Sequence, residues 1–396
     1  MKIKPMIRNN ICLSSHPAGC VKSVENQIEY IKTLAPLAGA GAPKLALVIG
    51  CSMGYGLATR IALAFGCGAA TIGLSMEKPG TATKTGSPGF YNNLAFDRAA
   101  AKEKLFSRSI DGDAFSNETK NACINAAKEA SAALGTKIDL VIYSLASPVR
   151  LDPKTGILHK SVIKPIGSPY SGETIDIVTG ELSNINIAPA TDEEIAATVK
   201  VMGGEDWELW MEALCNAGLL AENFRTVAFT YIGPESSWPI YKNGTIGRAK
   251  ADLERAFRAI NKKFSRQCAW VSVNKAVVTR ASAVIPIIPY ISALFKVMKA
   301  KKTHEGCIEQ AARLLSQKLY SGEAAHNADM VPVDDEHRIR LDEFELRPDV
   351  QEETAKEISY GLEKLDVSFF KHDFLEAHGF DIAGVDYEAE QNTAGI

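Results

Sequence analysis

Short apolar runs alternate with amphipathic segments along the chain. Six runs read as strands, and they lie at 44–50, 69–77, within 105–114, and at 137–148, 224–233 and 269–279. The segments "YGLATRIALAFG" and "ETKNACINAAKEASAAL" read as helices between them. A run that is apolar almost throughout, such as "KIDLVIYSLASP", is typical of a strand buried on both faces. The alternation therefore predicts an α/β fold with a mainly parallel, doubly wound sheet.

A glycine-rich turn follows the first of these runs. "GCSMGYG" places Gly50, Gly54 and Gly56 between a strand and a helix, where a tight turn lets the backbone approach a pyrophosphate. Glu77 ends the second run, 21 residues after Gly56. In Rossmann-type sites a carboxylate at this sequence separation accepts hydrogen bonds from the ribose hydroxyls of NAD. The same carboxylate would repel the 2′-phosphate of NADP. This pattern predicts a dinucleotide site of the Rossmann type.

Two further strand ends should reach the same edge of the sheet, because parallel strands end together. The third strand ends in "DGDA", so Asp113 could contact the adenine amino group or could instead cap the following helix. The fourth ends in "YSLASP", which predicts that Leu145 and Ala146 lie along the nicotinamide ribose.

We expect one enlarged Rossmann-type catalytic domain over residues 1–396, because neither a repeat nor a Pro/Gly/Ser-rich linker divides the chain. Helical insertions should form a substrate-side lobe. The expected parts are an NAD-binding core at about 44–150 and 224–282, substrate-side insertions at about 151–223 and 283–325, and a helical C-terminal cap at about 326–396.

A tyrosine and a lysine stand in the stretch "YIGPESSWPIYKNGTIGRAK", residues 231–250. Tyr241 and Lys250 are separated by eight residues, so they cannot lie on adjacent turns of one helix. We expect Tyr241 in a loop and Lys250 on the helix "TIGRAKADLERAFRAINKKF". Short-chain reductases use a tyrosine as proton donor and a lysine that holds the cofactor ribose, usually with three residues between them.

Taken together, these features resemble the FabV-type enoyl-acyl-carrier-protein reductases and the related trans-2-enoyl-CoA reductases. The matching motifs are Gly50-x3-Gly54-x-Gly56, Glu77, "DGDAFS", "YSLASP", "VMGGEDW", Tyr241-x8-Lys250, "FKVMKAKKTHEGCIEQ" and "GFDIAGVDYEAE". The similarity covers nearly the whole chain. The eight-residue spacing separates this branch from other short-chain reductases.

The resemblance implies a monomer that uses NADH to reduce the 2,3 double bond of enoyl thioesters on CoA or acyl carrier protein, in fatty acid synthesis or fermentative butyryl-CoA formation. Tyr241 would be the proton donor, and Tyr231 would contact the substrate. The implied NAD contacts are Gly50, Cys51, Ser52, Met53, Gly54, Tyr55, Met76, Glu77, Asp113, Ala114, Leu145, Ala146, Lys250, and the end of the last strand at Val277, Val278 and Thr279.

The apolar run at 281–295 has two interpretations. It is either a buried core helix or, as the resemblance favours, a wall of the acyl pocket that Pro286 and Pro289 would kink. The run is too short to span a bilayer, so no membrane partner is expected.

Composition and spacing narrow the remaining classes of function. The formal net charge is −3 with basic residues scattered among acids, which disfavours nucleic acid as a partner. The eight cysteines contain no CxxC motif and are expected to be free, mostly buried thiols of a cytoplasmic protein. The pair His16 and Cys20 offers only two ligands, so we expect no metal. The expected chemistry needs no flavin.

Two other functions could use the same elements. A short-chain carbonyl or alcohol dehydrogenase would apply the tyrosine and lysine to a C=O group. A nucleotide-sensing protein would keep the dinucleotide site without any chemistry. The spacing and the long insertions disfavour the first alternative, and the presence of both Tyr241 and Lys250 disfavours the second.

Overall fold

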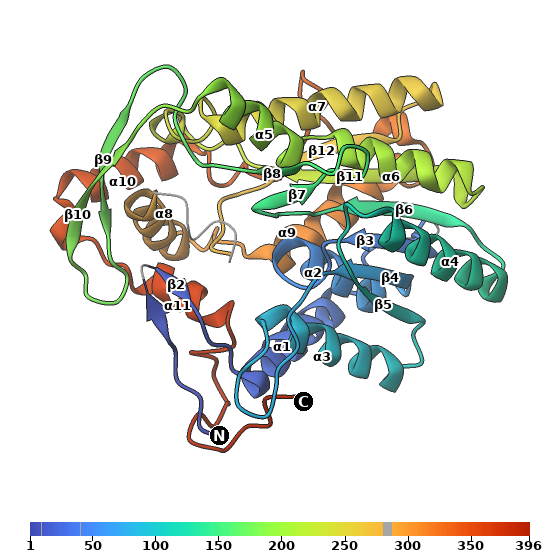
Figure 1. Cartoon of the computed structure of the whole chain (residues 1–396), viewed down its shortest axis with the longest axis horizontal. Coiled ribbons are helices and arrows are strands. Elements are labelled where there is room, and N and C mark those ends of the chain that lie inside the picture. The colour runs from blue at the N-terminus through green and yellow to red at the C-terminus, as the bar shows by residue number, and fades with distance from the viewer. Residues whose placement is uncertain (9, 40, 280–286) are drawn as a thin grey trace.

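A seven-stranded parallel sheet forms the centre of the computed structural model, which describes residues 1–8, 10–39, 41–279 and 287–396 (Figure 1). Across the sheet the strands lie in the order β13 (Ile339–Arg340), β12 (Ala269–Val273), β11 (Leu220–Thr230), β6 (Ile138–Tyr143), β3 (Leu45–Ile49), β4 (Ala70–Ser75) and β5 (Ser107–Asp111). Strand order reverses between β3 and β6, which is where ligands bind in such sheets. The predicted doubly wound α/β fold is confirmed.

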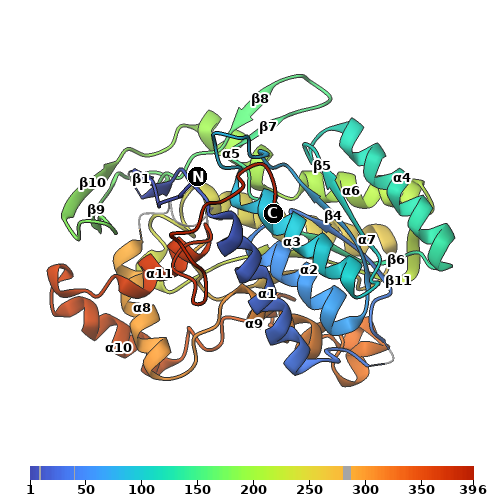
Figure 2. The same ribbon diagram turned by 90° about the horizontal axis from the view of Figure 1, so that it is seen from below.

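Alternate residues of each central strand pack into two different hydrophobic clusters. In β3, Ala46 and Val48 join one cluster, while Leu47 and Ile49 join the other. The first cluster is covered by α1 (Pro17–Leu34), α2 (Gly54–Ile61), α3 (Pro88–Lys102) and α9 (Cys307–Arg313), and the second by α4 (Asn117–Leu134), α6 (Glu205–Asn216) and α7 (Thr245–Phe264). Figures 1 and 2 show these helices on opposite faces of the sheet.

The helix boundaries follow from local chemistry. Ser116 caps α4 by accepting a hydrogen bond from the N–H of Thr119, and Gly135 ends that helix with a φ of 62°. Thr191 and Glu194 form a capping box at the start of α5 (Asp192–Met202), which packs against α7. Helix α2 continues into a π-helical turn, η1 (Ala62–Gly66).

A third hydrophobic cluster lies beside the sheet. It is built around α8 (Ile288–Ala300), which packs against α10 (Pro348–Ser359) and α11 (Ser368–Glu376). Three hairpins lie outside the central sheet: β1 (Ile7–Arg8) with β2 (Ile11–Cys12), β7 (Val149–Leu151) with β8 (Leu158–Lys160), and β9 (Tyr170–Ile175) with β10 (Leu182–Ile187). The β7–β8 hairpin packs against α5. The β9–β10 hairpin lies next to α8 (Figure 1).

Short helical turns connect the larger elements of the chain. They are η2 (Glu235–Ser237), η3 (Leu314–Leu319), η4 (Gly322–Ala325), η5 (Ala328–Met330) and η6 (Leu362–Lys364). The two ends of the chain lie side by side in both views, and the N–H of Gln391 donates to the carbonyl oxygen of Met1 at 3.0 Å. Among the described residues, no helix is both long and apolar enough to cross a bilayer.

Three expectations about the fold need correction. The strand expected at 269–279 ends at Val273, and the following residues form an irregular segment. The last part of the chain is more than a cap, because β13 joins the central sheet and pairs with β12. Two residues are too few to give a periodic signal in the sequence. Pro289 lies in the first turn of α8, where proline is tolerated, so it does not kink that helix.

The apolar run can be followed only in part. Pro286 and the rest of 281–286 lie outside the described residues. From Ile288 to Phe295 every residue is buried, which confirms a buried helix over this part of the run. Trp207 and Trp210 are fully buried in the second cluster. All eight cysteines are free, and four of them are fully buried.

Candidate active site

The glycine-rich turn lies at the carboxyl end of β3, against the end of β6. Gly50 has a φ of 87° and Gly54 a φ of 52°, in the left-handed region that favours glycine. A Cβ atom on Gly50 would lie 2.3 Å from the carbonyl oxygen of Ser144, and one on Gly56 would lie 1.8 Å from that of Gly50. Because α2 begins here without a side-chain cap, the turn fits a pyrophosphate bound by backbone N–H groups.

The first residues of the turn are already bonded within the protein. The N–H groups of Gly50 and Cys51 both donate to the carbonyl oxygen of Leu74, at 2.8 and 3.0 Å. The Cys51 side chain is fully buried. Any contact of these two residues with a cofactor must therefore use other atoms, and the N–H groups closer to α2 are the better candidates for a phosphate.

Glu77 follows β4 and is fixed by two neighbours. The Ser52 hydroxyl donates to its Oε1 at 2.6 Å, and its own N–H donates to the Asp111 carboxylate at 2.9 Å. Oε2 is shielded from solvent and has no hydrogen-bond partner in the protein. A shielded carboxylate oxygen without a partner is costly unless a ligand supplies a donor. The site therefore fits the ribose hydroxyls of NAD, as the sequence predicts.

Asp113 and Ala114 stand in the turn between β5 and α4. Asp113 accepts a hydrogen bond from the N–H of Phe115 at 3.0 Å, whereas Ser116 is the residue that caps α4. The alternative of Asp113 as a helix cap is therefore wrong. Its carboxylate stabilises the turn itself, and the contact with adenine stays a prediction.

A buried ion pair between Lys120 and Asp206 holds that turn in place. The Lys120 ammonium donates to the carbonyl oxygens of Ala114 (2.8 Å) and Phe115 (3.2 Å), and it lies 2.7 Å from the Asp206 carboxylate. Tyr143, at the end of β6, donates to the other Asp206 oxygen at 3.2 Å. Asp206 belongs to the motif "VMGGEDW", which was the only signal for this pair in the sequence.

Met76, Leu145 and Ala146 lie just beyond the ends of β4 and β6, at the edge of the sheet that holds the glycine-rich turn. The Met76 side chain is largely exposed, Leu145 is half-buried and Ala146 is exposed. The Ser144 N–H donates to the carbonyl oxygen of Ile49 at 2.8 Å, which joins the ends of β6 and β3. The strand ends thus meet as predicted.

Val277, Val278 and Thr279 do not end a strand, because β12 stops at Val273. Thr279 is nevertheless close to the dinucleotide turn, since a Cβ atom on Gly54 would lie 3.4 Å from its Cγ2. The Tyr55 hydroxyl donates to the carbonyl oxygen of Lys275 at 2.7 Å, which ties α2 to the same segment.

Tyr241 and Lys250 occupy a loop and a helix, as their spacing predicts. Tyr241 lies in the turn before α7, and its carbonyl oxygen accepts from the N–H groups of Gly244 and Gly247 at 3.2 and 3.1 Å. Lys250 lies on α7, and its ammonium donates to the carbonyl oxygen of Phe229 on β11 at 3.1 Å.

Burial in the protein shifts the pKa values of both side chains. Burial raises the pKa of the Tyr241 hydroxyl above its ordinary value, so the hydroxyl keeps its proton at neutral pH. Burial also lowers the pKa of Lys250 to about 8, so its ammonium form still predominates at pH 7. The pair therefore offers a neutral proton donor and a positive charge.

Tyr231 lies at the end of β11, with its ring edge-on to that of Tyr241 and the centroids 5.1 Å apart. Its hydroxyl donates to the Glu345 carboxylate at 2.8 Å, and the Tyr290 hydroxyl donates to the same oxygen at 3.0 Å. The sequence indicated Tyr290 only as part of the apolar run at 281–295, and it did not indicate Glu345, because no motif includes that residue.

Lys275 is a second buried lysine near this cluster. Its ammonium donates to the carbonyl oxygen of Ala276 and lies 4.6 Å from the centre of the Phe295 ring. Burial lowers the pKa of Lys275 to about 8, against the opposing charge of Glu345. The sequence did not single out this residue either.

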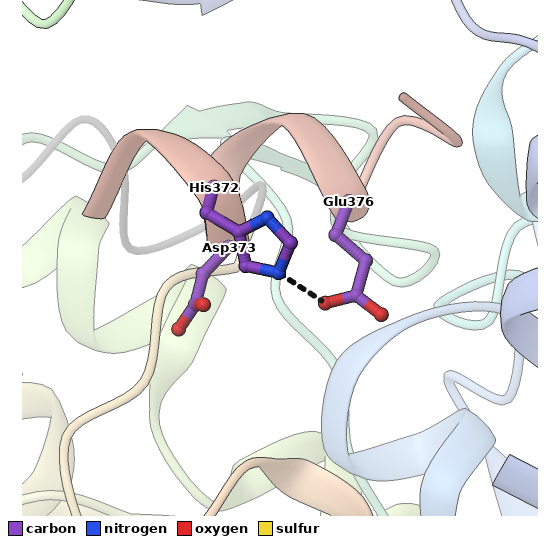
Figure 3. A group of neighbouring side chains, drawn as sticks. All are labelled: His372, Asp373 and Glu376. Atoms are coloured by element: carbon purple, nitrogen blue, oxygen red, sulfur yellow. Dashed lines mark ion pairs between the residues drawn. The ribbon is translucent and has the colours of Figure 1, made fainter. Parts of the chain in front are cut away.

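One group of possible metal ligands occurs in the described part of the chain. His372, Asp373 and Glu376 lie on α11 and bring three ligand atoms within 4.8 Å of one another (Figure 3). His372 is 2.8 Å from Asp381, and Asp373 is 3.4 Å from Lys299. Because these atoms already pair with protein charges, the group is explained as a network of ion pairs. His16, whose pairing with Cys20 offers too few ligands for a metal site, caps α1.

Models of three protein families match consecutive parts of the chain. "NAD(P)H binding domain of trans-2-enoyl-CoA reductase" matches residues 2–82, and "Trans-2-enoyl-CoA reductase catalytic region" matches residues 84–320. "Enoyl reductase FAD binding domain" matches residues 333–390. Together these ranges include nearly every residue discussed above.

Characterised proteins and solved structures agree with these matches. The chain is 55% identical to a trans-2-enoyl-CoA reductase [NADH] of Treponema denticola, over 98% of both chains. It is 51% identical to an enoyl-[acyl-carrier-protein] reductase [NADH] of Flavobacterium johnsoniae, over 99% of this chain and 98% of the relative. The crystal structure of the Treponema denticola enzyme in complex with NAD superposes with a TM-score of 0.92 at 54% identity, over 99% of this chain and 98% of that one.

Proposed function

The chain belongs to the trans-2-enoyl-CoA reductase family, and on this premise we propose that it reduces the 2,3 double bond of trans-2-enoyl thioesters with NADH. Relatives that are named for CoA and for acyl carrier protein share the thioester as their substrate class. One observation carries the chemistry: Tyr241 is buried in the loop before α7, and the Lys250 ammonium on α7 reaches Phe229 at the carboxyl end of β11, the edge of the sheet that holds the glycine-rich turn. The carbonyl or alcohol dehydrogenase alternative lacks comparable support.

When bound, NADH supplies the hydride that the β-carbon of the substrate receives. Negative charge then develops on the thioester oxygen, where a correctly placed donor is worth about 3–4 kcal/mol. Tyr241 holds that proton, because burial keeps its hydroxyl neutral. The Tyr241 side chain is buried, and the two hydrogen bonds to its carbonyl oxygen hold its backbone in the turn before α7.

Lys250 has two roles, one toward the cofactor ribose and one toward the negative charge that develops on the substrate. Its ammonium, anchored at the Phe229 carbonyl, has donors left for a ribose hydroxyl, since an ammonium carries three protons. Its positive charge also favours the developing enolate. Glu77 holds the other end of the cofactor, where its partnerless oxygen accepts from the adenosine ribose.

The other predicted contacts complete this dinucleotide site. The turn residues Ser52, Met53, Gly54 and Tyr55 take the pyrophosphate, and Asp113 with Ala114 takes the adenine. Leu145 with Ala146 and the segment Val277–Thr279 lie along the nicotinamide end. The support for this assignment is that all of these residues stand at one edge of the sheet.

A single catalytic domain is part of the proposal. It is supported by the way in which the C-terminal segment enters the rest of the molecule: β13 extends the central sheet, and Glu345 is buried among residues of β11 and α8. A segment that completes both the sheet and the site would not fold separately. Removing residues 326–396 should therefore abolish cooperative unfolding, as measured by calorimetry.

NADH as the only redox cofactor is also proposed, although residues 333–390 match a family description that includes FAD. In this chain that range supplies β13, α10, α11 and Glu345, so its described contacts are with the protein itself. The protein as purified should show no flavin absorbance near 450 nm and should turn over with NADH alone. One equivalent of bound flavin would contradict this part of the proposal.

The oligomeric state and the compartment are proposed on less direct grounds. The family resemblance favours a monomer, and eight free cysteines are typical of a reducing cytoplasm. Light scattering coupled to size exclusion tests the first. Retention of all eight reactive thiols in protein isolated from the native cell tests the second.

The decisive experiment follows the loss of absorbance at 340 nm when NADH and crotonyl-CoA are mixed with the protein. We expect rapid NADH oxidation and butyryl-CoA as the product. Crotonyl-acyl carrier protein, tested in parallel, separates the two carriers. Activity with aldehydes or ketones but none with either enoyl thioester would reject the proposed function.

A further inference from the structure

Glu345 is a fully buried carboxylate beneath the substrate-side tyrosines. It stands in the turn after β13, far in sequence from the residues that it contacts. One oxygen accepts from the hydroxyls of Tyr231 (2.8 Å) and Tyr290 (3.0 Å), and the other accepts from the N–H of Ala276 (2.7 Å). Donors from three separate segments thus converge on one side chain.

Each of the three segments belongs to the catalytic region. Tyr231 is the residue whose ring packs against Tyr241. Ala276 begins the segment that leads to Thr279 beside Gly54 of the dinucleotide turn. Tyr290 lies in the first turn of α8, and Gln351 on α10 braces the cluster by donating to the backbone oxygen of Glu345 at 2.7 Å.

The charge state of Glu345 decides where the hydroxyl protons lie. Burial raises its pKa, whereas the Ala276 N–H, the nearby Lys275 and the two hydroxyls all favour the carboxylate. The Ala276 N–H and both tyrosine hydroxyls are directed at its two oxygens, so Glu345 is the acceptor toward both tyrosines. A tyrosine has a single hydroxyl proton, so Tyr231 has none left for a substrate.

We propose that Glu345 is a positioning residue that holds the hydroxyl proton of Tyr231, so that of two adjacent tyrosines only Tyr241 can donate to the thioester oxygen. Tyr231 then meets the substrate through its ring or as an acceptor. If Glu345 did not hold this proton, the Tyr231 hydroxyl would compete for the substrate oxygen and draw it away from Tyr241. This inference rests on the proposed reductase function and concerns which tyrosine acts.

The test uses four variants of the full chain: Glu345→Gln, Tyr231→Phe, the double variant, and Tyr290→Phe as the matched control. A glutamine side chain keeps the size of Glu345 but turns one acceptor into a donor, so it cannot serve all three donors. We expect Glu345→Gln to lower kcat about tenfold or more, with the Kd for NADH within about twofold of wild type. Tyr290→Phe removes the other hydroxyl from the same oxygen but leaves Tyr231 bound to Glu345, so it should lower kcat less than Glu345→Gln does.

The double variant separates this role from a merely structural one. Without its hydroxyl, residue 231 cannot compete, so Tyr231→Phe should keep kcat within about fivefold of wild type. In the Glu345→Gln background it should restore kcat by about threefold or more. A double variant slower than Glu345→Gln alone, or unchanged from it, would overturn the inference. So would an unaltered Glu345→Gln enzyme, or a loss of about 100-fold in Tyr231→Phe, which would make Tyr231 a donor.

Two possible difficulties have defined consequences. If Glu345→Gln does not fold, Tyr231→Phe still tests the central claim that Tyr231 gives no proton to the substrate, because a proton donor at position 231 predicts a large loss of kcat in this variant. If the wild type does not oxidise NADH with any enoyl thioester, the proposed function fails, and the inference about its proton donor fails with it. An active wild type with variants that break the expected pattern rejects the inference and leaves the function intact.

Discussion

Two buried carboxylates, Asp206 and Glu345, support the two halves of the site in different ways. On the nucleotide side, Asp206 pairs with a buried ammonium, Lys120, at 2.7 Å. On the substrate side, Glu345 is surrounded by two hydroxyls and a backbone N–H, while Lys275 directs its ammonium at a carbonyl oxygen.

The difference follows from what each half has to do. The Lys120–Asp206 pair fixes one loop in one position, and breaking a buried pair of this kind typically costs about 3–5 kcal/mol of stability. The donors around Glu345 come from β11, α8 and the segment after β12, so they align three segments at once. An ion pair suits a rigid nucleotide loop, whereas distributed neutral donors suit a region where protons must be allotted to particular oxygens.

The largest effect on turnover should come from Tyr241→Phe, on the substrate side. Its hydroxyl acts only on the developing charge, so kcat should fall about 100-fold or more while NADH still binds. Steady-state kinetics with crotonyl-CoA and NADH fluorescence titration measure the two quantities. If kcat of Tyr241→Phe stayed within threefold of the wild-type value, Tyr241 would not be the proton donor.

Lys250→Met should lower both turnover and NADH affinity, because we propose that Lys250 holds the cofactor ribose and also supplies positive charge. We expect losses of about tenfold or more in both kcat and NADH affinity. Lys262→Met, at the exposed end of the same helix, is the matched control and should behave as wild type. Equal behaviour of the two variants would place Lys250 outside the site.

The pH profile sharpens the role of the same lysine. Burial lowers the pKa of Lys250 to about 8, so the charged form is present below that pH and is lost above it. The kcat/KM of the wild type should therefore fall as pH rises through about 8, and Lys250→Met should lack this decline. A wild-type profile that stays flat to pH 9.5 would contradict the assignment.

On the nucleotide side, Glu77→Ala should narrow a preference for NADH over NADPH of about 10- to 1000-fold. The variant loses ribose contacts with NADH and a repulsion toward the 2′-phosphate of NADPH. The two exposed lysines Lys78 and Lys84 partly offset that repulsion in the wild type. The measurement is kcat/KM for both cofactors, and an unchanged ratio in the variant would show that Glu77 does not discriminate between them.

The smallest effect on the kinetic constants should come from Asp206→Asn. Asparagine keeps one acceptor for Lys120 but removes the charge, so the KM for NADH should rise about fivefold with kcat unchanged. Glu208→Gln, which alters a surface ion pair on the same helix, is the control and should leave both constants unchanged. A fall in kcat larger than the rise in KM would mean that Asp206 also supports the reacting end of the site.

The positions of the residues proposed for the nucleotide half could be predicted well, because these residues follow one another in short strand–turn–helix units. Gly50 and Glu77 each stand one or two residues past a strand, so locating the strand also located the residue. The sequence failed where the backbone leaves this pattern. Asp113 looked like a helix cap because it precedes α4, yet Ser116 takes that role. The segment at Val277 looked like a strand because it is apolar, yet β12 had already ended.

The sequence by itself determined the alternation of strands and helices, the glycine-rich turn, and the placement of Tyr241 in a loop and Lys250 on a helix. Periodicity, turn propensity and spacing are local properties, and local properties are written in consecutive residues. Only the tertiary structure decided which polar and charged side chains meet in the interior. Tyr231 and Glu345 are 114 residues apart, and Lys120 and Asp206 are 86 apart. Contacts of this kind leave no periodic trace, because they arise when separate elements pack and each buried polar group must find a partner.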